Sequence, residues 1–151
     1  MERLYDIANS EIEQLNNWLK VNYLKMNIDK TKYMLFSATA RKSETTKAIK
    51  IEGKNIEKIE NYKYLGCTIS ANLKWNEHVI NLRSKIAKFI PVIYSIRDKI
   101  NEKNKLLFYN TIIKSNLTYA IEIYCKTTKG NLKALQKLQN YVLKILYGLK
   151  R

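Results

Sequence analysis

Apolar positions change their spacing once along this chain, near Trp75, and the change divides the sequence into two parts. Before it, apolar residues recur at helical spacing over residues 2–22 and then lie in short alternating or continuous runs. After it, three stripes with steps of three and four residues follow one another. The pattern therefore predicts an α+β protein, in which a helix and a small antiparallel sheet precede a bundle of three helices.

The first part is predicted to hold one helix and several short strands. The amphipathic helix of residues 2–22 has its acidic residues toward its N-terminal half, where the helix dipole favours them. Tyr33–Phe36 is a short, aromatic-rich run that is typical of a strand. Alternating isoleucines flank Gly53-Lys54-Asn55 and indicate a hairpin, and Tyr62–Ser70 predicts a further strand. The polar residues 37–47 have no periodicity, so we expect a loop there.

The second part is predicted to form three helices, because each apolar stripe must be buried against the others. The stripes run from Val79 to Ile100, from Leu106 to Tyr124 and from Leu132 to Leu149. Pro91 should kink or split the first helix, because proline lacks an amide donor and clashes with the preceding turn. The heptad-like spacing is also compatible with a coiled coil, although the short connections favour a bundle within one chain.

Composition agrees with one domain or two small subdomains. Of 151 residues 46% are hydrophobic and only four are glycine, which favours a packed core over disorder or a loop-rich fold. Cys67 and Cys125 lie in apolar surroundings without metal-ligand spacing, so we expect two buried free thiols in a reducing compartment. There is no signal-peptide pattern and no membrane-spanning run, so we expect an intracellular protein, cytoplasmic or nuclear, or a fragment of one.

The distribution of charge adds the first indication of a partner. Lysine and arginine number 28 against 13 acidic residues, which gives a formal net charge of +15. The excess lies almost wholly in residues 74–151, which hold 16 basic and 4 acidic side chains. Such a surface repels itself unless a polyanion neutralises it, and nucleic acid is the commonest polyanionic partner. A merely lysine-rich composition is the alternative, and an acidic membrane surface is much less favoured.

Two motifs and their order indicate a family. The stretch Asn27-Ile28-Asp29-Lys30-Thr31-Lys32-Tyr33-Met34-Leu35-Phe36 follows the N-terminal helix, and Tyr62-Lys63-Tyr64-Leu65-Gly66-Cys67-Thr68-Ile69 precedes Trp75-Asn76-Glu77-His78. In this order they resemble the end of the palm and the start of the thumb of reverse transcriptases of non-LTR (LINE or jockey-like) retrotransposons. The resemblance covers residues 2 to about 147, although the tryptophan that the family usually has near Tyr124-Cys125 is absent.

The resemblance implies that residues 1–73 are the C-terminal part of a polymerase palm and that residues 74–151 are a thumb-like domain. In the family, palm aspartates that precede the counterpart of residues 2–22 hold two Mg²⁺ ions. This sequence has no Asp-Asp pair, and Asp6, Asp29 and Asp98 each stand alone. We therefore expect no catalytic residue, no metal site and no cofactor in this chain, and no polymerase activity from it alone.

The resemblance also implies which residues handle nucleic acid. Lys30 or Lys32 could lie near a phosphate, while Asn27 and Asp29 are equally typical of a tight turn or cap. The second motif resembles the hairpin that holds the primer end, and the thumb helices of the family contact duplex phosphates. Glycine in that hairpin would permit close backbone approach. The expected nucleic-acid-binding residues are Tyr62, Lys63, Tyr64, Gly66, Lys74, Arg83, Lys85, Lys88 and Arg97.

For three residues the sequence leaves a structural interpretation open. Tyr62 and Tyr64 could simply be cross-strand packing residues. His78 matches a position where the family often carries a histidine, yet a lone histidine is more often structural than catalytic.

We therefore interpret the chain as a partial RNA-directed DNA polymerase of a non-LTR retrotransposon. It would retain binding of RNA or an RNA–DNA duplex, and the missing N-terminal polymerase portion is a further candidate partner. One alternative is a stand-alone RNA-binding module derived from such an element. The other is a helical interaction module that dimerises through its apolar stripes.

Overall fold

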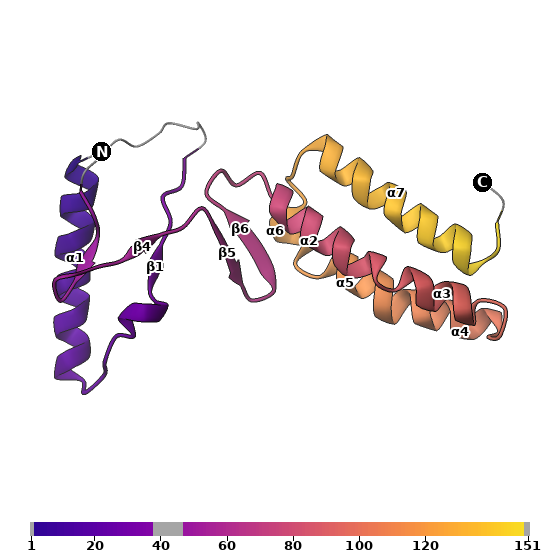
Figure 1. Cartoon of the computed structure of the whole chain (residues 1–151), viewed down its shortest axis with the longest axis horizontal. Helices are drawn as coiled ribbons and strands as arrows, with labels where there is room; N and C mark the ends of the chain where they lie inside the picture. Colours follow the sequence, from indigo (N-terminus) through magenta and orange to yellow (C-terminus); the bar gives the residue numbers. More distant parts are fainter. Residues whose placement is uncertain (1, 38–46, 150–151) are drawn as a thin grey trace. The chain divides into compact units, whose positions relative to one another are not determined.

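The computed structural model describes residues 2–37 and 47–149, which fall into two compact units (Figure 1). The first unit holds the described residues up to Tyr62 together with Ala71–Leu73, and the second holds Lys63–Ser70 and the described residues from Lys74 onward. Apart from its two ends, the polar loop expected over residues 37–47 lies outside the described residues. The α+β fold class is confirmed, whereas the assignment of residues 1–73 and 74–151 to a palm and a thumb stays a prediction.

The first unit consists of one long helix and short strands that pair two by two. Its elements are α1 (Glu2–Val21), the 3₁₀ turn η1 (Ile28–Lys30), β1 (Lys32–Tyr33), β2 (Lys50–Ile51), β3 (Lys54–Asn55) and β4 (Glu57–Lys58). β2 and β3 form the predicted antiparallel hairpin, in which Lys54 and Asn55 belong to the strand and not to the turn. β1 pairs with β4 in parallel, with Lys32 opposite Glu57. The strand expected over Tyr33–Phe36 is therefore shorter and begins one residue earlier.

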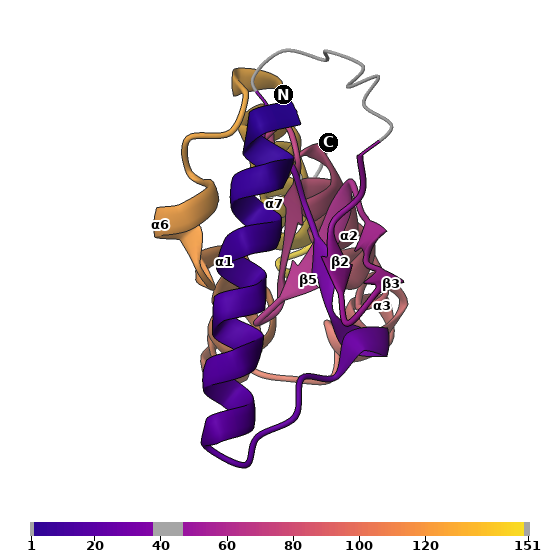
Figure 2. The same ribbon diagram turned by 90° about the vertical axis from the view of Figure 1, so that its left-hand side faces the viewer.

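A small core holds the first unit together. Tyr5 of α1 is buried against Ile49, Ile51 and Ile56 from the strand region, and its ring meets that of Tyr33 edge to face at 6.2 Å. Figure 2 shows α1 running beside β2, and the two elements are in contact.

Polar contacts also fix α1 to the strands, whereas much of its apolar stripe is exposed. The Asn9 side-chain amide donates to the Ala48 carbonyl at 3.2 Å, and its oxygen accepts from the Lys50 amide at 2.8 Å. By contrast Leu4, Leu15 and Trp18 are each about half exposed. Burial on α1 is therefore confined to a narrow face.

The second unit joins a β-hairpin to a set of helices. The hairpin is formed by β5 (Asn61–Tyr64), whose last two residues belong to this unit, and β6 (Cys67–Ser70). The helices are α2 (Asn76–Ala87), α3 (Ile90–Ile96), α4 (Glu102–Phe108), the π-helical segment η2 (Tyr109–Lys114), α5 (Ser115–Thr118), α6 (Ile121–Tyr124) and α7 (Lys129–Leu146).

The three predicted stripes are recovered in these helices. Pro91 lies in the first turn of α3 and separates it from α2, so the predicted split of the first stripe is confirmed. The second stripe becomes the run α4–η2–α5, which begins at Asn101, whose side chain caps the Asn104 amide at 2.9 Å. Ala120, whose φ is 53°, interrupts the helical run before α6. The third stripe is α7, which is capped by Thr128.

The core of the second unit takes its most deeply buried side chains from α2, α3, η2, α6 and α7. The most deeply buried residues, each at most 2% exposed, are Val79, Ile86, Ile93, Ile113, Tyr124, Val142 and Leu146. They belong to one continuous cluster, so removing volume from any helix leaves a cavity that the others must tolerate. Both cysteines are free thiols, as predicted, but only Cys67 is buried; Cys125, the residue after α6, is exposed, so the prediction that both are buried is wrong for Cys125.

We expect Leu146→Ala to lower the free energy of unfolding by about 2–5 kcal/mol, because Leu146 is fully buried on α7. Urea unfolding followed by circular dichroism measures the loss. Leu107→Ala is the matched control: it removes the same atoms from a side chain that is 59% exposed, and should cost about 0.5 kcal/mol or less. Equal losses of stability in the two variants would contradict the assignment of Leu146 to the core and of Leu107 to the surface.

Candidate functional site

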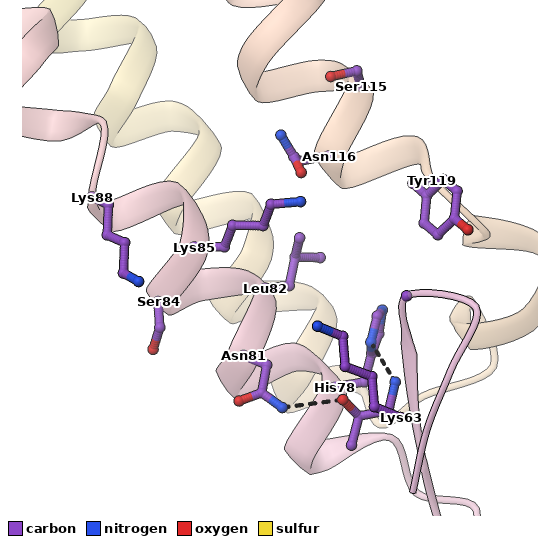
Figure 3. Close-up of a pocket in the computed structure, with 12 residues that line it drawn as sticks. Lys63, His78, Asn81, Leu82, Ser84, Lys85, Lys88, Ser115, Asn116 and Tyr119 are labelled. Atoms are coloured by element: carbon purple, nitrogen blue, oxygen red, sulfur yellow. Dashed lines mark hydrogen bonds between the residues drawn. The ribbon is translucent and has the colours of Figure 1, made fainter.

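A groove of about 750 Å³ opens within the second unit, between the β5–β6 hairpin, α2 and the α5 region. We call it the hairpin groove. The hairpin supplies Lys63, Gly66 and Thr68 to its wall. The other residues that line it, drawn in Figure 3, are His78, Asn81, Leu82, Ser84, Lys85, Lys88, Ser115, Asn116 and Tyr119.

Two hydrogen bonds join the hairpin to α2 at the floor of this groove. The backbone amide of Thr68 donates to His78 Nδ1 at 3.2 Å, and Asn81 Nδ2 donates to Thr68 Oγ1 at 3.1 Å (Figure 3). Because Nδ1 accepts a hydrogen bond, it cannot carry the ring proton, and neutral His78 must be protonated at Nε2. The position of Thr68 on β6 is thus fixed by two side chains that lie one turn apart on α2.

His78 is enclosed by aromatic rings. Its side chain is only 6% exposed, and its ring centroid lies 4.8 Å from that of Tyr124 and 6.2 Å from that of Trp75. Burial lowers the pKa of His78 below its ordinary value, because charging the ring in this setting costs desolvation energy. Nε2 is buried and has no hydrogen-bond partner among the described residues. These contacts give His78 the structural role that the sequence favoured.

The tip of the hairpin is held by a residue that the sequence did not single out. Leu65 and Gly66 have φ values of 45° and 82°, as the two central residues of a primed hairpin turn require. The Tyr119 hydroxyl donates to the Leu65 carbonyl at 2.6 Å. A Cβ atom on residue 66 would lie 3.1 Å from Tyr119 Cε1. Gly66 is therefore needed both for the turn and for the close approach of the tyrosine ring.

Three lysines give the hairpin groove its charge. Lys63 belongs to β5, Lys85 to the last turn of α2, and Lys88 directly follows the end of α2. All three side chains are exposed. None of them forms an ion pair with a carboxylate of the described residues, and no acidic residue lines the groove. Lys85 extends across the space between α2 and α5 (Figure 3). With His78 neutral, the groove carries three uncompensated positive charges, which favour an anionic partner.

Other residues expected to bind nucleic acid lie elsewhere. Arg83 borders a different groove, although it belongs to the same helix as Lys85. Tyr62 and Tyr64 are exposed on β5 without lining the hairpin groove, and Arg97 pairs with Asp98 at 3.2 Å. The backbone carbonyl of Lys74 accepts a hydrogen bond from Thr127 Oγ1 at 2.9 Å. The structure thus brings together Lys63, Gly66, Lys85 and Lys88 from the expected set.

Lys30 and Lys32 belong to the first unit. Asn27 caps η1 by accepting from the Lys30 amide at 3.1 Å, so the first motif forms the turn that was one of its two interpretations. Lys32 pairs across the β1–β4 ladder with Glu57, its partner in register. A role near a phosphate for either lysine stays a prediction.

Five polar residues that line the hairpin groove outside the two motifs were not predicted from the sequence. On α2 one signal was present: residues 78, 81, 85 and 88 follow steps of three and four and so share one face of the helix. A polar stripe beside an apolar one usually indicates solvated surface, so the sequence alone did not mark these residues as a site. No comparable signal marks Ser115, Asn116 and Tyr119 in the α5 region, because these residues reach the groove only through tertiary packing. The missed residues are Asn81, Ser84, Ser115, Asn116 and Tyr119.

Two further properties bear on what the chain can do. Within residues 2–37 and 47–149, no group of three or more His, Cys, Asp or Glu side chains could hold a metal ion. In the same part of the chain, no helix is long and apolar enough to cross a membrane.

Comparison with known proteins identifies curated relatives that share most of this chain. A probable RNA-directed DNA polymerase from the transposon X-element of Drosophila melanogaster is 27% identical over 139 residues, 89% of this chain. The RNA-directed DNA polymerases from the mobile element jockey are 24% identical, over 91% of this chain in Drosophila melanogaster and 95% in Drosophila funebris. The chain spans about 15% of the length of these relatives. No family model and no solved structure matches it.

We expect Gly66→Ala to destabilise the protein by more than the backbone conformation alone requires. The left-handed φ costs about 1–2 kcal/mol for an alanine, and the new methyl group must also displace the Tyr119 ring. Gly53→Ala is the matched control, because Gly53 has φ 78° in the β2–β3 turn and a Cβ there meets nothing within 4 Å. Thermal unfolding of both variants measures the difference. Equal losses would show that the Tyr119 contact is unimportant.

We expect the stability of the protein to fall as the pH is lowered from 7 to 5 because of His78. Its pKa is lowered in the folded state, so the unfolded chain takes up the proton first, and the free energy of unfolding decreases below the ordinary pKa of 6.5. His78 is the single histidine of the chain. His78→Asn keeps an acceptor for the Thr68 amide and should remove the pH dependence in this range. Urea unfolding of both proteins at several pH values tests this, and parallel profiles would contradict it.

Proposed function

We propose that this chain, whose curated relatives are RNA-directed DNA polymerases of non-LTR mobile elements, is the part of such a polymerase that holds the template–primer duplex. The observation that carries the proposal is the hairpin groove, which Lys63, Lys85 and Lys88 line without a compensating carboxylate among the described residues.

The chemistry of the groove suits a nucleic-acid backbone. Lysines attract phosphates as point charges, and each neutralised phosphate releases counterions, which supplies affinity independent of sequence. Asn81, Ser84 and Asn116 add neutral groups that can hydrogen-bond to phosphate or to a ribose 2′-hydroxyl. Lys63 of β5, Asn81 and Ser84 of α2 and Asn116 of α5 belong to three elements that hydrogen bonds and packing fix to one another, so the groove needs little reorganisation before binding.

The rigidity of the hairpin supports the same proposal. Its backbone is held by His78 at β6 and by Tyr119 at the turn, with hydrogen bonds of 3.2 and 2.6 Å. Lys63 therefore projects from a fixed strand toward the lysines of α2. Tyr62 and Tyr64 alternate with Lys63 along β5, so their exposed rings point to the opposite face of the strand and are not part of the contact proposed for this groove.

Catalysis would come from elsewhere in the polymerase. The chain spans about 15% of its relatives' length, and its described residues offer no carboxylate cluster for the Mg²⁺ ions that polymerases use. We expect the chain alone to bind a duplex without extending a primer. A stand-alone RNA-binding module is the second candidate, and the same groove would serve it.

The dimerisation alternative is less favoured than duplex binding, because the central positions of the apolar stripes are buried within the second unit. The stripes that would form a coiled coil hold Ile86, Ile113 and Val142, and all three are fully buried inside the second unit. These residues cannot also form an interface without unfolding the bundle.

We expect the combined change of Lys63, Lys85 and Lys88 to glutamine to weaken binding of a labelled RNA–DNA duplex and to make it less sensitive to salt. Removing three phosphate contacts should make the slope of log affinity against log salt shallower by about two to three. Fluorescence anisotropy at several salt concentrations measures both quantities.

The charge-matched control replaces Lys25, Lys54 and Lys126, which lie outside the hairpin groove, by glutamine. It should retain most of the affinity. An equal loss in the control would mean that the net charge alone drives binding, and salt-independent binding by the wild type would overturn the proposal.

A further inference from the structure

A second basic groove lies within the second unit, between α2 and α7. Its volume is about 540 Å³, and we call it the α7 groove. Arg83 enters it from α2, and Lys133, Lys137 and Tyr141 enter it from α7, with Leu138 among the apolar residues of its wall. Figure 1 shows α7 running alongside the α2–α3 segment.

The two grooves lie on different sides of α2. Arg83 and Lys85 are two residues apart, which places them about 200° apart around a helix with 3.6 residues per turn. Lys85 lines the hairpin groove and Arg83 lines the α7 groove, and Leu82 and Ile86, which are buried in the core, lie between them on this helix. The basic residues of α2 therefore cannot all line one groove.

The lysines of α7 form a self-repelling stripe. Lys129, Lys133 and Lys137 recur every four residues, so neighbouring ammonium groups lie one turn apart on one face, and like charges at this spacing destabilise a helix. α7 contains no acidic residue along Lys129–Leu146. None of these lysines pairs with a carboxylate of the described residues, and neither does Arg83. A bound polyanion would remove this repulsion.

Tyr141 continues the same stripe one step beyond Lys137. Its side chain is 36% exposed, it borders the groove, and its hydroxyl forms no hydrogen bond with any described residue. Tyr119 of the hairpin groove differs, because its hydroxyl is bound to Leu65 and its ring is packed against Gly66. Cations in line with an available aromatic ring suit an unpaired strand, whose phosphates and base faces are both accessible. A duplex keeps its bases stacked inside and offers the ring no base face.

We propose that the α7 groove binds single-stranded nucleic acid, with Arg83, Lys133 and Lys137 on the phosphates and Tyr141 stacked on a base. The positive end of the α7 dipole, near Gly130 at the edge of the groove, adds to the attraction for phosphate. This inference goes beyond duplex holding and does not depend on the hairpin groove, since the two grooves share no residue.

The test compares two probes on the full 151-residue chain: a fluorescent oligouridylate and a blunt RNA–DNA duplex, each titrated at about 50 and about 200 mM salt. Lys133→Gln combined with Lys137→Gln should lower affinity for the single strand about tenfold and change affinity for the duplex less than twofold. The three glutamine substitutions of the hairpin groove should give the reverse pattern. Circular dichroism confirms that each variant is folded.

Tyr141 separates stacking from charge. Tyr141→Ala should weaken single-strand binding about tenfold, and Tyr141→Phe, which keeps the ring, should not. The proposal fails if the wild type does not bind the oligouridylate at low salt, if the α7 variants lose duplex binding equally, or if polyglutamate competes as well as RNA. The last result would point to an acidic protein surface. If the wild type binds the oligouridylate but does not bind the duplex, the proposed function is overturned and this inference stands.

Discussion

The hydrogen bond from the Thr68 amide to His78 Nδ1 is the contact on which the geometry of the candidate site depends. A two-stranded hairpin is marginal by itself in water, so this one needs an external anchor. His78 supplies it from a buried position, fixed by Trp75 and Tyr124, and Tyr119 secures the turn of the hairpin. Without these contacts Lys63 would have no defined position relative to the lysines of α2.

Much of the architecture could be predicted from the sequence, because it follows from periodicity. The N-terminal helix, the β2–β3 hairpin, the split at Pro91 and the three apolar stripes all appear where the pattern placed them. Strand pairing was harder, because two-residue strands carry too little pattern to specify partners. β1 pairs in parallel with β4, and the paired residues Lys32 and Glu57 are 25 residues apart in the sequence.

The candidate site was predictable only in part, for a geometric reason. Charge counts correctly placed the basic excess in the second half, but a count does not say which way a side chain points. Arg83 and Lys85 look equivalent in the sequence and line different grooves. Tyr119 is one of 11 tyrosines, and no residue near it in the sequence indicates that its hydroxyl bonds to Leu65, 54 residues earlier. Long-range pairing of this kind requires a structure.

The hairpin anchor also constrains how this segment can be inherited. Residues 63–70 are strands by conformation, yet they cluster with the helices and not with the strands that precede them. A recombination event or deletion that joined new sequence just before α2 would preserve every helix and still leave His78, Asn81 and Tyr119 without their partners. The smallest segment that can be exchanged between related proteins with these contacts intact therefore begins before Lys63, ahead of the helices themselves.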